Sequence, residues 1–154
     1  MSRLAFLSPH EADVVGVSPL RHVLSPAFTD VSHLGKLEVR GDVDALDALA
    51  LAPGRALLVL DDDPLVERDR LVDQGYRVYD MTAALAALEV EGEDLMRRLT
   101  ELDLDTLPAI GAIARGTTAL IERRGGERFR LFVPQELGQF VAEVVNDMAR
   151  GLGR

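Results

Sequence analysis

The sequence predicts an α+β fold made of two related halves, with mostly antiparallel sheet and helices on one face. The first observation is a repeat, since residues 37–41 (LEVRG) return as residues 88–92 (LEVEG). Similar chemistry precedes each copy, because Asp-Val-Ser at 30–32 returns as Asp-Met-Thr at 80–82. The second observation is that strand-like and helix-like stretches alternate in both halves. This order is typical of a split βαβ, or ferredoxin-like, unit that occurs twice.

The first half, residues 28–78, is expected to alternate strands with helices. Strands are predicted from alternating or continuous apolar residues at 36–40, 55–60 and 76–80. In the first of these, Lys36, Glu38 and Arg40 share the polar face. A helix is predicted from Asp42, a suitable N-cap, to the Pro-Gly pair at 53–54. The next helix is predicted to begin at Pro64, because Asp63 before a proline is a strong helix start.

The second half, residues 79–151, is expected to repeat this order with an added hairpin. Strands are predicted at residues 83–91, 110–114, 117–123 and 128–133. The glycines at 125 and 126 predict the turn between the last two, and a helix is predicted over residues 93–100. Pro134 is expected to begin the longest helix, whose buried stripe would comprise Leu137, Phe140, Val141, Val144, Val145 and Met148.

The N-terminal residues 1–27 are expected to form an arm outside the single duplicated domain at 28–154. Ser-Pro pairs at 8–9 and 18–19 favour extended or irregular backbone. A short strand at 12–17 is the alternative for part of the arm. The arm is expected to lie on the domain or on a partner.

Composition excludes several classes of protein. The 154 residues contain no Cys, which excludes disulfide scaffolds, thiolate metal sites and a Cys nucleophile. The formal net charge of −9 argues against electrostatic binding to nucleic acid or an anionic membrane. No apolar run approaches the roughly 20 residues that a membrane span needs, and no signal peptide is recognisable. We therefore expect a cytoplasmic protein with no nucleic acid and no membrane among its partners.

Three aspartates in succession, Asp61, Asp62 and Asp63, form the most conspicuous acidic cluster. Paired carboxylates hold hard cations in many proteins. The favoured interpretation is a solvated loop in which Asp63 caps the next helix, because this also explains Pro64. No metal ligands are therefore predicted.

The repeated acids Asp30 and Asp80 are expected to cap turns, with Ser32 and Thr82 assisting. His33 follows Ser32, but adjacency in sequence does not make a catalytic pair. The other histidines, His10 and His22, are too scattered to indicate a metal site.

Two glycine-containing segments are expected to be turns. The Gly-Gly pair at 125–126 lacks the Lys-Ser/Thr and the following helix of a phosphate loop. Residues 115–117 (Arg-Gly-Thr) are expected to form a turn, with anion contact as the alternative. No catalytic residues are predicted, and residues for a cofactor are left open.

Two sets of residues resemble one superfamily. Residues 29–42 (TDVSHLGKLEVRGD) resemble the opening motif of the glycine-cleavage T-protein, a folate-dependent aminomethyltransferase. Residues 78–82, 88–92, 103–105 and 129–134 resemble the small gamma subunit of heterotetrameric sarcosine oxidase, as do chain length and the strand at 55–60. The resemblance spans about residues 28–150 and implies an aminomethyltransferase folate-binding-domain-like fold. The long region that carries a catalytic aspartate and folate pocket in complete aminomethyltransferases has no counterpart here.

The resemblance implies a non-catalytic gamma-like subunit of a sarcosine oxidase-type complex, which demethylates sarcosine in one-carbon metabolism. FAD, FMN and NAD would then lie on alpha- and beta-like partner subunits, and this chain would bind no cofactor. Two alternatives remain. One is a small aminomethyltransferase-like protein that binds tetrahydrofolate, and the other is a stand-alone homo-oligomeric module of the same fold.

Overall fold

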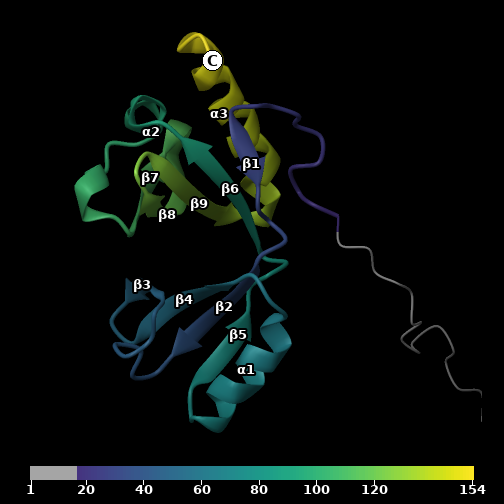
Figure 1. Ribbon diagram of the computed structural model, residues 1–154, viewed down its shortest axis with the longest axis vertical. Helices are drawn as coiled ribbons and strands as arrows, with labels where there is room; N and C mark the ends of the chain where they lie inside the picture. Colours follow the sequence, from purple (N-terminus) through teal and green to yellow (C-terminus); the bar gives the residue numbers. More distant parts are fainter. Residues whose placement is uncertain (1–16) are drawn as a thin grey trace, which may run out of the picture.

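The polypeptide folds into two antiparallel sheets with helices on their outer faces, an α+β architecture (Figure 1). The computed structural model describes residues 17–154. The large sheet has the strand order β1 (Phe28–Asp30), β6 (Leu85–Glu91), β9 (Arg128–Pro134), β8 (Thr117–Gly125) and β7 (Ala109–Ile113). The small sheet has the order β3 (Leu49–Ala52), β4 (Arg55–Leu60), β2 (Gly35–Arg40) and β5 (Arg77–Asp80). The α-helices of this part of the chain are α1 (Pro64–Asp73), α2 (Glu93–Leu99) and α3 (Gly138–Gly151).

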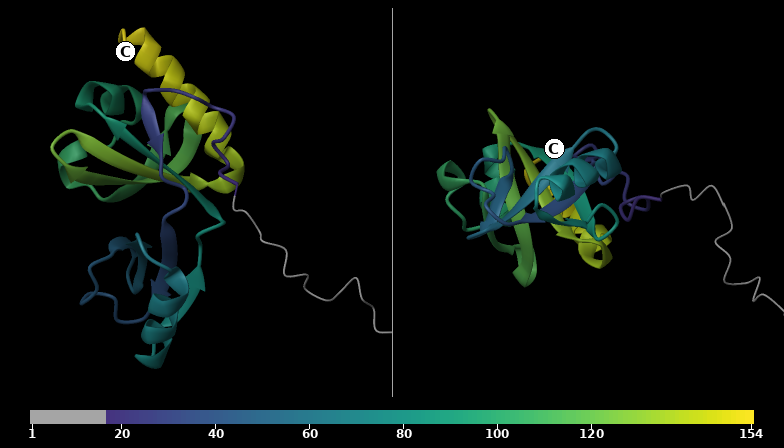
Figure 2. Two further views of the ribbon diagram at one scale, coloured as in Figure 1. Left: turned by 45° about the vertical axis from the view of Figure 1, so that its right-hand side comes forward. Right: turned by 90° about the horizontal axis from the view of Figure 1, so that it is seen from below.

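Three apolar clusters arrange these elements as helix, sheet, sheet and helix (Figure 2). The largest lies between the large sheet and helices α2 and α3, and includes Leu88 and Phe129. A smaller one packs Leu71 of α1 against Leu37 of β2. The third, called here the inter-sheet cluster, joins the two sheets through Leu57, Ala87, Leu120 and Phe132. Each sheet therefore buries apolar side chains on both faces.

The prediction of mostly antiparallel sheet with helices on one face holds for each sheet, but the strands divide into two sheets that pack together. Strands β2 and β6 carry the repeated segments and belong to different sheets. Each is the second strand from the edge of its own sheet. Alternation along β4 shows the reason, since Ala56 packs towards α1 while Leu57 packs towards the other sheet. A strand with apolar residues on both faces needs a second layer as well as the helix.

The two repeated segments occupy matching positions in the two sheets. Leu37 of β2 lies opposite Asp80 of β5, and Leu88 of β6 lies opposite Asp30 of β1. The register continues in both pairs, with Val39 opposite Val78 and Val90 opposite Phe28. Strand β1 therefore joins the sheet of the second repeated segment, while β5 joins the sheet of the first.

The helix predicted between Asp42 and the Pro-Gly pair at 53–54 is wrong. Residues 42–48 form turns, and residues 49–52 form strand β3, which pairs with β4. Leu49 and Leu51 face the inter-sheet cluster, whereas Ala50 and Ala52 are exposed. The apolar period here is two rather than 3.6, and pairing with β4 selects the strand. From β2 onward, the first half therefore runs strand, strand, strand, helix, strand.

The remaining predicted strands and helices are present within a few residues of their expected bounds. A short 3-10 turn at Gln135–Leu137 precedes α3. Within the predicted stripe of α3, Val141 and Val145 are buried but Phe140 is 36% exposed. Two alanines, Ala142 and Ala149, complete the buried face instead. Small side chains bring this helix close to the large sheet.

Residues 17–27 lie against the large-sheet half of the molecule. Leu20 is 1% exposed and packs in the largest cluster. A Cβ on Gly138 would lie 3.0 Å from the Cδ2 of Leu20 and 2.8 Å from the Cβ of Ala86, so a glycine permits this approach. This part of the predicted arm thus packs on the domain. The alternative strand at 12–17 lies almost entirely outside the described residues.

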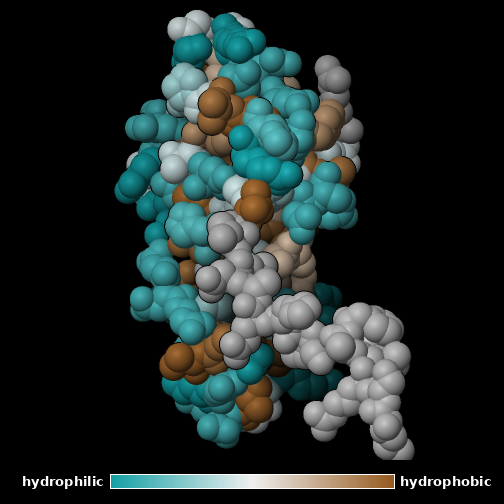
Figure 3. All heavy atoms as spheres, turned by 90° about the vertical axis from the view of Figure 1, so that its right-hand side faces the viewer, coloured by the Kyte–Doolittle hydropathy of each residue, from teal (hydrophilic) through white to brown (hydrophobic). Residues whose placement is uncertain are grey.

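The outer surface of α1 carries exposed apolar side chains (Figure 3). Leu65, Val66 and Val72 are about half exposed or more, with Val66 at 73%. The helix covers the small sheet mainly through Leu71, which is fully buried.

Candidate functional site

Two chain segments cross between the sheets, and each begins with one of the repeated acids. In the first, the Oδ1 atom of Asp30 accepts a hydrogen bond from the Ser32 amide at 3.0 Å. In the second, the Oδ1 atom of Asp80 accepts one from the Thr82 amide at 2.9 Å. Both are Asx turns, so the capping role predicted for the two aspartates is confirmed. We call residues 30–36 and 80–87 together the junction.

The hydroxyl groups of the junction bind the backbone of the opposite segment. The Ser32 Oγ atom accepts a hydrogen bond from the Ala87 amide at 3.1 Å and lies 3.4 Å from the Ala87 carbonyl oxygen. The Thr82 Oγ1 atom accepts one from the Lys36 amide at 3.1 Å. Each repeated hydroxyl thereby fixes the strand of the other half. Because Ser32 is held in this way, its hydroxyl is not positioned as a nucleophile.

Lys36, the single lysine of the sequence, is completely buried in the junction. Its Nζ atom donates a hydrogen bond to the Ser32 carbonyl oxygen at 2.7 Å. Burial lowers the pKa of Lys36 to about 8, although the negative charges of Asp30 and Asp80 act in the opposite direction. The two repeated acids therefore compensate one buried ammonium group.

The strand pattern places Lys36 on a polar face, and the structure shows that this prediction is wrong about its exposure. The side of β2 that carries Lys36 faces the large sheet near the junction and not solvent. The repeat contained one signal that this position is buried. The residue that precedes the second LEV segment is Ala87, which is apolar and is also buried.

A cavity of about 740 Å³ lies beside the junction and is open to solvent. Its polar lining residues are Ser18, Asp30, Ser32, His33, Asp80, Thr82 and Gln135. Burial opposes ionisation of Asp30, but hydrogen bonds from the Ser18 hydroxyl and from Ser32 outweigh it and lower the pKa of this carboxyl. Carboxylates, hydroxyls and an amide suit a ligand that donates hydrogen bonds. Proton abstraction by a Ser-His pair is not supported, since Ser18 donates to Asp30 and Ser32 is bound to Ala87.

The acidic loop at 61–63 serves the helix that follows it. The Oδ1 atom of Asp63 accepts a hydrogen bond from the Leu65 amide at 2.9 Å, as expected of an N-cap. Across residues 17–154, no group of three or more acidic or histidine side chains is arranged to hold a metal ion. His10 lies outside the described residues, and His22 is exposed on the N-terminal segment.

The two predicted glycine turns are present. Gly125 and Gly126 have φ of 114° and 57° and connect β8 to β9. Residues 114–116 form a 3-10 turn, and Thr117, the last residue of the predicted turn, is the first residue of β8.

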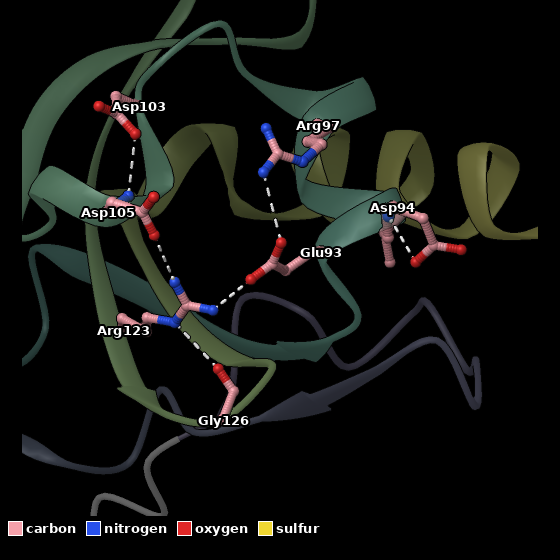
Figure 4. Close-up of polar contacts among 8 residues, drawn as sticks. Glu93, Asp94, Arg97, Asp103, Asp105, Arg123 and Gly126 are labelled. Carbon is pink, nitrogen blue, oxygen red and sulfur yellow. Dashed lines mark hydrogen bonds and ion pairs between the residues drawn. The ribbon is translucent and has the colours of Figure 1, made fainter.

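A second polar cluster, centred on Arg123, joins the α2 side of the large sheet (Figure 4). The Nε atom of Arg123 donates a hydrogen bond to the Gly126 carbonyl oxygen at 2.9 Å, and its Nη atoms contact Glu93 and Asp105. The guanidinium carbon also lies 5.2 Å from the centre of the Phe129 ring. These contacts tie α2, the 103–106 turn and the β8–β9 hairpin together.

In the described part of the chain, none of the helices is long and apolar enough to cross a membrane. No protein-family model matches the sequence, and no curated protein matches it either. The fold is similar to a chain of the heterotetrameric sarcosine oxidase from Corynebacterium sp. U-96, solved in complex with pyrrole 2-carboxylate. The TM-score is 0.70, with 14% sequence identity over 90% of this chain and 97% of that chain. At this identity the likeness establishes a related fold.

Proposed function

We propose that the protein is a non-catalytic, gamma-like subunit of a heteromeric complex of the sarcosine oxidase type. The observation that carries the proposal is the fold likeness to one chain of a heterotetrameric sarcosine oxidase over nearly the full length of both chains. The resemblance of residues 29–42 and 129–134 to the same superfamily supports it from the sequence. In this proposal FAD, FMN and NAD lie on the partner subunits, and the complex demethylates sarcosine in the cytoplasm.

The geometry of the junction supports a structural rather than a catalytic role. The hydroxyl of Ser32 binds backbone of the opposite segment, and the carboxylates of Asp30 and Asp80 hold turns. Their charges also compensate Lys36. Side chains committed to such contacts are poor candidates for proton transfer to a substrate.

Co-expression tests the proposal. The chain, carrying an affinity tag, is produced together with alpha- and beta-like flavoprotein subunits of the sarcosine oxidase type. We expect a stable complex that absorbs as a flavoprotein and oxidises sarcosine, whereas the chain alone shows no such activity. Recovery of the chain only as a monodisperse homo-oligomer, with no flavoprotein retained, would contradict the proposal and favour a stand-alone module.

We further infer that the two halves are copies of one aminomethyltransferase-like unit. The matching registers of β1 with β6 and of β5 with β2 support this inference. Strand pairs β4 with β2 and β9 with β6 support it as well, since Leu58 and Leu131 occupy equivalent positions opposite Leu37 and Leu88. In this view β1 takes the same place beside β6 that β5 takes beside β2.

A second candidate function is a small tetrahydrofolate-binding protein. The cavity beside the junction favours it, because it is large enough for a drug-sized ligand and carries a few convergent polar groups. Isothermal titration with tetrahydrofolate should then give saturable heat, which Asp80→Leu should reduce. No heat at high protein concentration would exclude this function.

A further inference from the structure

The inner faces of the two sheets change from apolar to charged along their strands. Leu57 of β4 and Phe132 of β9 belong to the inter-sheet cluster. Arg55 lies two residues before Leu57, and Arg130 lies two residues before Phe132, so each arginine shares a strand face with its apolar neighbour. The sheets are therefore packed together near the junction, and their inner faces carry charge farther from it.

The charged part of the small sheet is dominated by arginine. Arg40 lies opposite both Arg55 and Arg77, so the three side chains share one face of β4, β2 and β5. We call Arg40, Arg55 and Arg77 the arginine face. Glu38 lies beside them on the same face, so the three arginines and this glutamate together carry a net charge of +2, on a chain whose net charge is −9. The arginine face is thus a local positive patch on an acidic protein.

The single carboxylate does not use all the donors of the arginine face. Glu38 accepts hydrogen bonds from the Nε atoms of Arg40 and Arg55 at 2.7 and 3.0 Å. Arg40 also stacks over the ring of Tyr79, at 4.7 Å from its centre, and Tyr79 is 44% exposed. Between residues 17 and 154, no ion pair forms at the exposed Arg77. Guanidinium N–H groups therefore remain free for an incoming acceptor.

The corresponding part of the large sheet is electrically balanced. Its inner face carries three glutamates and three arginines, namely Glu89, Glu91, Glu122, Arg124, Arg128 and Arg130. Arg130 contacts Glu89 at 3.2 Å and approaches Glu122 at 3.9 Å. The inner face of the large sheet therefore adds no net positive charge. The positive charge is confined to the small sheet.

An apolar groove of about 250 Å³ adjoins the arginine face. It is lined by Leu51, Leu57, Ile110 and Phe132, and Glu38 stands at its border with the arginines. Ile110 is 47% exposed. It lies on the edge strand β7, beside the edge strand β3 (Figure 1). An apolar cleft with polar and charged groups at its rim is typical of a recognition surface.

We propose that the apolar groove and the arginine face together dock an extended segment of a partner protein, in which carboxylates flank one apolar anchor residue. The anchor would pack on Leu57 and Ile110, and the carboxylates would accept hydrogen bonds from Arg40 and Arg77. This partner belongs to the complex of the proposed function. The identity of the partner therefore rests on the proposed function. The acidic and apolar character of the docked segment rests on the groove and the arginine face alone.

Charge distribution selects a peptide over nucleic acid. A phosphate backbone presents acceptors along its whole length and would meet the acidic remainder of the chain. It would also meet Glu38 at the centre of the arginine face. A short acidic-apolar segment engages the patch and the groove without crossing the acidic surface.

The direct test titrates the isotopically labelled chain with two peptides and follows its backbone amide signals. The first peptide is a 12-mer with one central Leu between Asp and Glu residues, and the second has lysine in place of each acid. We expect saturable shifts in β2, β5 and β7 with the acidic peptide, and none with the lysine peptide. Equal shifts with both peptides, no shift in these strands, or tighter binding of a single-stranded oligonucleotide would each overturn the proposal.

Matched variants locate the binding. Arg77→Glu and Ile110→Glu should each weaken acidic-peptide binding about tenfold, because they reverse a charge and place a charge in the groove. Both positions are exposed, so folding should be retained. Arg150→Glu on α3 and Val66→Glu on α1 make the same chemical changes on other surfaces and should leave the affinity within about twofold. Equal losses in all four variants would contradict a localised site.

Hydrogen exchange of the reconstituted complex separates this inference from the proposed function. Protection of β2, β5 and β7 in the complex is the expected result. A complex that forms without protecting these strands would refute the docking site and leave the proposed function intact. Peptide binding in the groove, together with no association with flavoprotein subunits, would refute the proposed function and leave the docking site intact.

Discussion

Lys36 lies at the centre of the junction, where its ammonium group is shielded from water and compensated by nearby acids. Its Nζ atom donates to the Ser32 carbonyl oxygen, which belongs to the same crossing segment as Asp30. Burial of a charge without a close partner is costly, and two aspartates at moderate distance compensate it only in part. The lowered pKa of about 8 expresses that balance.

Stability should therefore rise with pH above 8. The pKa of Lys36 is about 8 in the folded state, whereas the ordinary pKa of an exposed lysine, as in the unfolded chain, is 10.5. Between these values the unfolded chain binds more protons, so the free energy of unfolding increases with pH, by up to about 1.4 kcal/mol per pH unit. Below pH 8 both states are protonated and the cost of burial is fully present.

Denaturant unfolding of the wild-type chain and of Lys36→Met between pH 7 and 10.5 measures this effect. The wild type should show the rise, and Lys36→Met should lack it because the titrating group is gone. Parallel pH dependence in the two proteins would show that other groups are responsible.

Residue-scale chemistry was only partly predictable from the sequence. The turn roles of Asp30 and Asp80 follow from local hydrogen bonding between neighbours, which a repeated Asp-x-Ser/Thr pattern records. Burial of Lys36 depends on the crossing of two segments about 50 residues apart. A local pattern carries no information about that contact.

At the scale of elements, α1 depends on its N-cap. Asp63 is expected to contribute about 1 kcal/mol to the free energy of unfolding through its bond to the Leu65 amide. Asp63→Ala should lower stability by about that amount in thermal or denaturant unfolding. Asp61→Ala, two residues earlier in the same acidic loop, is the control and should have little effect. Equal effects, or stabilisation of the wild type by added Ca²⁺, would favour the cation site instead.

The cluster around Arg123 makes a second prediction about elements. Arg123→Met removes contacts to Glu93, Asp105 and Gly126 at once, while keeping apolar bulk over Phe129. The melting temperature should fall by about 3 °C or more. Arg97→Met is the control, because Arg97 is 65% exposed and pairs with Glu93 at 3.4 Å. A fall of the same size in both variants would argue against a special role for the Arg123 cluster.

Helix and strand assignments from the sequence succeeded where the chain gives both a period and an end signal. Helix α1 has Asp63 and Pro64 at its start and Gly75 after its end. Residues 42–52 offer Leu and Ala at spacings that fit either period, and long-range pairing with β4 decides the outcome.

At the scale of the whole molecule, we expect the inter-sheet cluster to make the two sheets unfold as one cooperative unit. Phe132→Ala should lower the free energy of unfolding by about 3–5 kcal/mol, because Phe132 is 2% exposed and fills the space against Leu57 and Leu120. Phe140→Ala, at a position that is 36% exposed, should cost much less. Circular dichroism and calorimetry should both show a single transition in the wild type. Two separated transitions would mean that each half unfolds on its own.

The α+β class and antiparallel pairing could be predicted because they follow from alternation and turn chemistry along the chain. The division into two packed sheets could not be. It depends on β1 crossing to pair with β6 and on β5 pairing with β2, and both are contacts between distant segments. The candidate site was predictable only as two turns, since the cavity arises where the segments cross.

Burial of the single lysine has a practical consequence for chemical labelling. Reagents that acylate amines will meet no accessible lysine on the folded protein, because Lys36 is enclosed. Amine-to-amine crosslinkers will therefore understate contacts between this chain and any partner. Carboxylate-directed crosslinkers are the better choice, given 26 acidic residues. The appearance of label at Lys36 would serve as a sensitive reporter of opening at the junction.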